Sequence, residues 1–166
     1  MEVSSAIQKR RSIRKYKADD ISHELLLEIL EGARQAPSGA NRQTWQVIVV
    51  TDLDRRRGLV PICKDQKFIA DGCAFIAGID DPGQKWARVD LAIAMEHIAL
   101  MAVEKGLGTC YVGAFDGERL AAYLSVPKPY VVTVCMVLGY PDEMPEARSR
   151  KPMNELVHWE RFGGGD

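Results

Sequence analysis

Between Lys9 and Tyr16 the sequence reads KRRSIRKY, and five of these eight side chains are cationic. Such a cluster could bind a nucleic acid, hold a single phosphate group, or form a solvated basic surface. The whole chain has a formal net charge of -1 at pH 7, and acidic residues follow the cluster at once. Because nucleic-acid-binding domains are usually basic overall, the sequence favours a small anionic ligand over a polymer.

A second segment, PSGANRQT at residues 37–44, combines small residues with amide side chains. Its small residues would let a ligand approach the backbone, and Asn41 and Gln43 offer both hydrogen-bond donors and acceptors. A flat heterocycle with N–H and C=O edges would match these groups. The same composition is also typical of an ordinary loop between a helix and a strand. This segment alone therefore leaves both interpretations open.

The motifs of common catalytic and metal sites are missing from the sequence. It contains no phosphate-binding G-x-x-x-x-G-K-[ST] loop, no G-x-S-x-G elbow and no C-x-x-C pair. His23, His97 and His158 lie far apart and form no H-x-x-x-H pair. We therefore predict no catalytic side chain and no metal site. The absence points to a binding protein, or to an enzyme whose chemistry belongs to a cofactor.

The chain has 166 residues with 46% hydrophobic and 27% charged residues, which predicts a single domain over residues 1–166. No apolar run is long enough to span a membrane, and the N-terminus lacks the pattern of a secretory signal. The four cysteines are widely spaced, which is typical of buried, reduced thiols. These features predict a cytoplasmic protein that binds neither membrane nor nucleic acid.

Predicted helices and strands alternate along the chain. Capping residues and the spacing of apolar residues predict helices over 3–9, 22–35, 52–60, 86–105 and 116–124. Apolar runs predict strands over 45–51, 73–79, 108–114 and 130–140, and NELVHW at 154–159 has strand or tail character. The strand at 45–51 is almost continuously apolar and should be covered on both faces. The class is α/β or α+β, with helices on both faces of the sheet.

The helix predicted over 86–105 is apolar nearly all round. A helix of this kind must be buried on several sides, and in a small domain a subunit interface is one way to achieve this. The sequence therefore also raises the possibility of an oligomer.

Five segments now occur in a diagnostic order: RRSIRKY, APSGANRQTWQVIVV, GLGTCYVGAFD, LGYP and RSRKPMNELVHWERF. Together they resemble the nitroreductase family of flavoproteins, from about residue 7 to residue 162. The resemblance implies an α+β, nitroreductase-like fold. In this fold, helices flank a central, mostly antiparallel sheet of four to five strands, and two chains form an intertwined homodimer with FMN sites at the subunit interface.

The resemblance also implies a phosphate clamp for FMN. Its first half, which holds the phosphate and the ribityl chain, maps to Arg10, Arg11, Ser12 and Arg14. Its second half maps to Arg148 and Arg150, with Lys151 as a possible substitute. Arginine suits this role because its planar guanidinium group matches phosphate oxygens. Lys9 and Lys15 are predicted to be a solvated flank.

Two further segments are implied to meet the flavin ring. The first, commonly supplied by the partner subunit, maps to Pro37, Ser38, Asn41 and Gln43. The second is a strand end that maps to Tyr111, Val112, Gly113 and Ala114, with backbone N–H groups of the last two near the flavin N5 atom. Thr44 stands where the family usually has proline, which alters the stiffness of the loop rather than a proposed contact.

The resemblance implies a ping-pong oxidoreductase. NADH or NADPH gives a hydride to flavin N5, and a nitroaromatic, quinone or similar small acceptor then takes its place. Residues 60–88 form a compact segment where larger family members carry an insertion over the active site. This short segment leaves an alternative function open, namely a flavin-binding or flavin-storing protein of the same fold with little reductase turnover.

Overall fold

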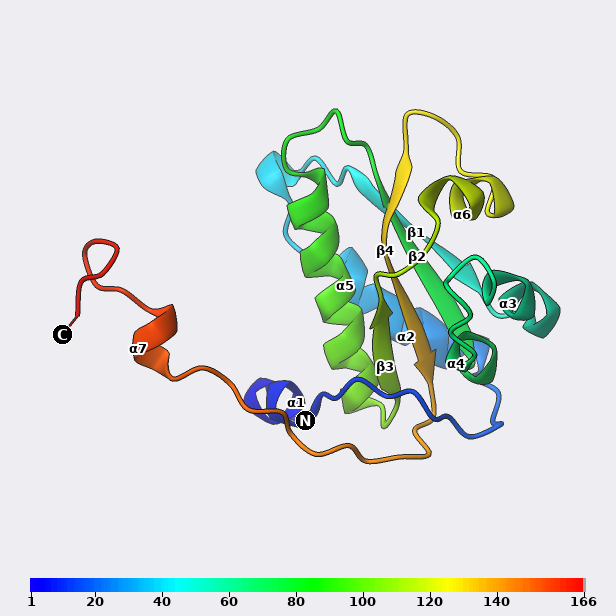
Figure 1. Cartoon of the computed structure of the whole chain (residues 1–166), viewed down its shortest axis with the longest axis horizontal. Coiled ribbons are helices and arrows are strands. Elements are labelled where there is room, and N and C mark those ends of the chain that lie inside the picture. Colours follow the sequence, from blue (N-terminus) through cyan, green and yellow to red (C-terminus); the bar gives the residue numbers. More distant parts are fainter. Residues whose placement is uncertain (166) are drawn as a thin grey trace.

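The computed structural model describes residues 1–165 and consists of an antiparallel sheet with helices packed on it (Figure 1). Its strands are β1 (Trp45–Val50), β2 (Ala74–Asp80), β3 (Gly108–Val112) and β4 (Val131–Gly139). Within the described residues these strands form a four-stranded sheet in the order β1-β2-β4-β3, and every neighbouring pair is antiparallel. The prediction of an α+β fold around an antiparallel sheet of four to five strands is confirmed.

The helices are α1 (Val3–Lys9), α2 (His23–Arg34), the 3-10 turn η1 (Gly39–Asn41), α3 (Leu53–Leu59), α4 (Phe68–Asp71), α5 (Ala87–Glu104), α6 (Gly117–Tyr123) and α7 (Met153–Leu156). Two of them begin at the predicted caps. The Ser22 hydroxyl accepts a hydrogen bond from the backbone N–H of Leu25, and the Asp116 carboxylate accepts one from that of Arg119. Each cap satisfies a backbone donor that the first helical turn leaves free.

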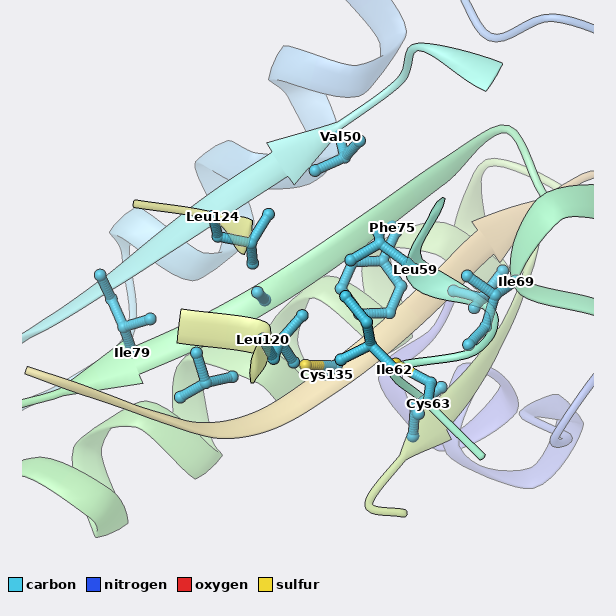
Figure 2. Packing of buried hydrophobic residues seen from close by; sticks show 14 of the residues in the cluster. Val50, Leu59, Ile62, Cys63, Ile69, Phe75, Ile79, Leu120, Leu124 and Cys135 are labelled. Carbon is cyan, nitrogen blue, oxygen red and sulfur yellow. The ribbon is translucent and has the colours of Figure 1, made fainter. Parts of the chain in front are cut away.

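Side chains alternate across the sheet, so each face has its own hydrophobic core. In β2, Ile76 joins the core beneath α2 and α5, whereas Phe75 joins the core beneath α3, α4 and α6. Figure 2 shows this second core, with Phe75 and Cys135 of the sheet packed against Leu120 of α6. The prediction that helices cover both faces is therefore confirmed.

Several predicted details were wrong. The strand at 45–51 is β1, at the edge of the sheet, and only Val50 in it is fully buried rather than all of it being covered on both faces. The predicted strand at 108–114 ends at Val112, where its pairing with β4 stops. Part of NELVHW lies in α7 rather than in a strand. Helix α4 and turn η1 were not predicted, because they are too short to show a periodic pattern.

The predictions about the cysteines and about membrane-spanning segments can be compared with the structure. Cys63, Cys73, Cys110 and Cys135 are all free and buried, as predicted. Burial raises the pKa of the Cys63 thiol to about 11, so it stays protonated at neutral pH. Among the described helices, none is both long enough and apolar enough to cross a membrane.

Arg56 of α3 is an unusual buried cation. It is only 6% exposed, and its guanidinium group donates to the carbonyl oxygens of Thr51, Ala70 and Gly72. Burial lowers the pKa of Arg56 from its ordinary value. The residue therefore fastens α3 to the junction between α4 and β2, where the backbone carbonyls would otherwise lack donors.

We expect Arg56→Met to lower the free energy of unfolding by about 2–4 kcal/mol, because three carbonyl groups would lose a charged donor in a buried place. Chemical denaturation followed by circular dichroism measures this difference. The matched control is Arg57→Met, which removes an exposed ion pair with Asp54 and should change stability by no more than about 0.5 kcal/mol. Equal effects of the two substitutions would contradict the structural role of Arg56.

Candidate cofactor-binding site

The basic N-terminal segment lies alongside β3. Ser12 forms a parallel bridge with Thr109, and the backbone N–H of Ile13 donates to the Thr109 carbonyl at 2.9 Å. Ile13 and Tyr16 are buried, and the Tyr16 hydroxyl donates to the Ile13 carbonyl at 2.6 Å. This arrangement directs Ser12 and Arg14 to the surface on either side of buried Ile13. The two apolar residues are therefore the anchors of the segment, as their positions in KRRSIRKY suggest.

A glycine allows this close approach. A Cβ atom on Gly108, at the start of β3, would lie 2.5 Å from the Cγ1 atom of Ile13. Any larger residue at position 108 would therefore push the basic segment away from the strand.

The two halves of the predicted clamp meet in one cavity of about 280 Å³. Its lining comes from the N-terminal segment and from the chain that follows β4: Arg10, Arg11, Ser12, Arg14, Glu143, Pro145, Glu146, Ala147, Arg148 and Arg150. Lys9 and Lys15 are exposed and do not line this cavity, in agreement with their predicted place in solvent. Lys151 does not line it either.

Most of the positive charge in this cavity has no carboxylate partner. Arg11 donates to the carbonyls of Gln8 and Arg10, and Arg150 donates to those of Arg148 and Ser149. Among residues 1–165, Arg10 is the one cavity arginine in an ion pair, with Nε 3.6 Å from Glu96 Oε1. The cavity therefore attracts an anion.

Glu143 has a structural role in the same cavity. Its Oε1 atom accepts hydrogen bonds from the backbone N–H groups of Arg14, at 2.6 Å, and Lys15, at 3.2 Å. The carboxylate thus ties the segment after β4 to the N-terminal segment and holds the two groups of arginines opposite each other.

The end of β3 is coupled to the clamp through Glu96 of α5. The Tyr111 hydroxyl donates to Glu96 Oε2 at 3.1 Å, and the other carboxylate oxygen faces Arg10. Burial and the charge of Glu96 raise the pKa of Tyr111, so its phenol stays protonated at neutral pH. Beyond the strand, Gly113 and Ala114 are exposed, and a Cβ atom on Gly113 would point into open space.

The PSGANRQT loop is held in a strained shape next to the start of α5. Ala40, Asn41 and Gln43 have φ angles of 52°, 54° and 52°, in the left-handed region. The Ser38 hydroxyl accepts from the backbone N–H of Gln43 at 3.1 Å, and the Gln43 amide donates to the Asn41 carbonyl at 3.2 Å. Each non-glycine residue in the left-handed region destabilises the folded chain by about 1–3 kcal/mol. Such residues cluster at functional sites.

One chain does not bring this loop and the clamp into a common cavity. Pro37, Ser38, Asn41 and Gln43 are absent from the lining of the arginine cavity. In Figure 1 the cyan chain near residue 40 lies at the first turn of α5, and α1 lies at its other end. Hydrogen bonds fix both positions, because the Gly39 N–H donates to Asp90 and the N-terminal amine donates to Glu104.

Comparison with known proteins assigns the chain to a family. A model described as the nitroreductase family matches residues 7–81 and 68–140, which together span most of the chain. This chain belongs to the nitroreductase family. Its membership agrees with the resemblance that the order of the sequence segments indicates.

Three relatives of this nitroreductase-family chain are informative. A protein named NADH dehydrogenase from Thermus thermophilus is 28% identical, with 96% of each chain covered. A putative NADH dehydrogenase/NAD(P)H nitroreductase from Methanothermobacter thermautotrophicus is 31% identical, over 89% of this chain and 82% of the relative. The structure of the Vibrio harveyi NADPH:FMN oxidoreductase, complexed with NAD⁺, has a TM-score of 0.90 and 25% identity, and the match covers 96% of this chain and 77% of that one.

Three residues at the site of this nitroreductase-family chain were not predicted from the sequence: Gln66, Glu96 and Glu143. Gln66 donates to the Ala114 carbonyl at 3.1 Å, so it holds the end of β3. Each of these residues acts on a partner that is distant in the sequence, and none lies in a motif. Only Glu96 could have been suspected of a role at the site from the sequence, because it is an acidic residue within a largely apolar helix.

Proposed function

We propose that this chain is an FMN-dependent oxidoreductase that takes a hydride from NADH or NADPH and reduces a small acceptor such as a nitroaromatic compound or a quinone. The cavity that joins five arginines and Ser12, whose backbone pairs with Thr109 of β3, is the observation that carries this proposal. The names of the relatives support it, because they include a NADPH:FMN oxidoreductase and NADH dehydrogenases.

The residues fit the cofactor. A phosphate monoester matches guanidinium groups that lack carboxylate partners, and the exposed Ser12 hydroxyl adds a compact donor. The open space above Gly113 fits a planar ring that lies against the backbone. Arg10, Arg11, Ser12, Arg14, Arg148 and Arg150 would therefore hold the phosphate and ribityl end, and Tyr111, Val112, Gly113 and Ala114 would lie beside the ring.

Bound FMN would supply the hydride-transfer chemistry, and the protein supplies position and charge. Glu96 orients Arg10 and Tyr111 together, and Glu143 fixes the backbone of Arg14. Backbone N–H groups at Gly113 and Ala114 would offer fixed dipoles to the ring. We assign no side-chain acid, because the Tyr111 phenol already donates to Glu96 and its pKa is raised.

We also propose a homodimer in which Pro37, Ser38, Asn41 and Gln43 of one chain complete the site of the other. A stripe of apolar residues along α5 is not fully covered within one chain, namely Val89, Ala92, Ile93, Leu100 and Val103. The chain after β4 extends away from the body and carries exposed apolar residues, including Met144 (94% exposed) and Phe162 (92% exposed) (Figure 1). A second copy would cover both surfaces.

The visible spectrum of the purified protein, with stopped-flow mixing, tests the proposal. We expect a yellow protein whose flavin absorbance is lost on addition of NADH or NADPH and returns on addition of a quinone. A colourless protein that does not take up FMN would contradict the proposal. Bound flavin that neither nucleotide reduces would favour a flavin-storing protein of the same fold.

A further inference from the structure

A second cavity, of about 390 Å³, lies at the start of α5 and has a different composition. Its lining comes from the PSGANRQT loop and from the turn before α5: Gly39, Arg42, Thr44, Gly83, Gln84, Lys85, Trp86 and Asp90. None of these residues lines the arginine cavity. The fold and the proposed cofactor clamp therefore leave this group of side chains without an assigned role.

Trp86 forms an exposed aromatic surface in this cavity. The residue is 49% exposed, although an indole of this size is usually well buried. The stem of this side chain rests on Gly39, where a Cβ atom would lie 3.3 Å from the Cβ, Cγ and Cδ1 atoms of Trp86. The Nζ atom of Lys85 lies 5.3 Å from the centre of the ring. The loop supports the indole, and within one chain about half of the Trp86 side chain is exposed.

Arg42 and Lys85 give the cavity an uncompensated positive charge. Arg42 donates to the Gly39 carbonyl at 3.3 Å, and within residues 1–165 neither cation forms an ion pair. The carboxylate of Asp90 is only 4% exposed, and both of its oxygens accept from the Gly39 N–H at 3.1 Å. Asp90 therefore serves the loop rather than the two cations.

The turn that carries Lys85 and Trp86 is tied at both ends. Asp80, at the end of β2, is fully buried and accepts a hydrogen bond from the Thr133 hydroxyl. Its other carboxylate oxygen lies 3.7 Å from the Nε atom of Arg88, in the first turn of α5. This contact closes the base of the turn, so the indole and the ammonium group are presented in a defined place.

We propose that Arg42, Lys85 and Trp86 bind the adenosine phosphate end of the nicotinamide dinucleotide. Adenine can stack on an indole, a contact that is worth about 1–3 kcal/mol for a base on an aromatic side chain. Phosphate groups pair with arginine and lysine. The inference rests on the proposed function, since the loop that borders the cavity also contains the residues assigned to the flavin ring. It goes further by naming the residues that select the electron donor.

Binding of adenine nucleotides without redox chemistry is the first test. We expect ADP and adenosine 2′,5′-bisphosphate to quench the tryptophan fluorescence with a saturable curve, and Trp86→Phe to remove that quenching. The double substitution Arg42→Gln/Lys85→Gln should raise the dissociation constant at least about tenfold, as expected for the loss of charge-assisted contacts. The absence of saturable quenching, quenching that survives in Trp86→Phe, or an unchanged dissociation constant in the double variant would overturn the inference.

Steady-state reduction of a quinone is the second test and identifies the phosphate that is bound. If the cations bind the pyrophosphate, the double variant raises the KM of both NADH and NADPH. If they bind the 2′-phosphate, only the KM of NADPH rises. Lys64→Gln, which removes an exposed lysine outside the cavity, is the matched control. Unchanged KM values for both nucleotides would overturn the inference.

The two proposals fail in different ways. A wild-type protein that binds no FMN contradicts the proposed function, and the fluorescence titration still decides whether the second cavity binds an adenine nucleotide. A wild-type protein that binds FMN and is reduced normally, but whose double variant keeps both KM values and the same flavin content, contradicts this inference alone.

Discussion

Arg14→Ala should raise the dissociation constant of FMN by about 10- to 100-fold and leave the fold intact. The substitution removes one cation from the arginine cavity, and a hydrogen bond to a charged group contributes about 1.5–3 kcal/mol. The backbone of residue 14 would keep its hydrogen bond to Glu143, so the N-terminal segment should stay in place. The side chain is exposed and lies 6.0 Å from the ring centre of Phe68, a contact that adds little to stability.

Titration of the apoprotein with FMN, followed by flavin fluorescence, measures the change. Lys15→Ala is the matched control, because it removes the same charge from the next residue, whose side chain does not line the cavity. The control should change the dissociation constant less than about twofold, as a screened surface charge does. If both substitutions weaken binding equally, general charge attracts the cofactor and no specific clamp exists.

Local patterns predicted most elements of this fold. Ser22 and Asp116 begin helices because a short polar side chain can accept a backbone N–H, and this depends on only a few neighbouring residues. The strands at the centre of the sheet were identified from their apolar runs. The position of β1 at the edge of the sheet was not predicted. An apolar run does not reveal whether the strand has neighbours on both sides or helices on both faces.

Fewer residues of the candidate site were predicted, because a local sequence pattern does not reveal contacts between distant parts of the chain. The arginines stand out because they are close together in KRRSIRKY, and the family resemblance connects them with Arg148 and Arg150. Glu143 and Glu96 are different, because each is defined by a contact with a residue far away along the chain. Trp86 also shows this limit, because its place at the start of the helix predicted over 86–105 does not reveal that its side chain is half exposed.

The separation of the loop from the clamp leads to a decisive test of the shared site. We consider two variants, Arg14→Ala/Arg148→Ala in the clamp and Asn41→Gly/Gln43→Gly in the loop. Glycine is the chosen replacement in the loop because residues 41 and 43 have left-handed φ angles, which glycine adopts without strain. Each variant alone should form a dimer that retains little FMN, because every one of its sites carries a defect.

Co-expression of the two variants with different affinity tags gives mixed dimers. In such a dimer, one site combines the intact clamp of one chain with the intact loop of the other, and the second site carries both defects. The purified mixed dimer should therefore retain about one FMN per dimer after gel filtration, whereas each parent retains much less. If each site were built from a single chain, mixing would restore nothing, because every chain contributes one defect. Recovery of flavin in the mixed dimer thus distinguishes a shared interface site from two independent sites.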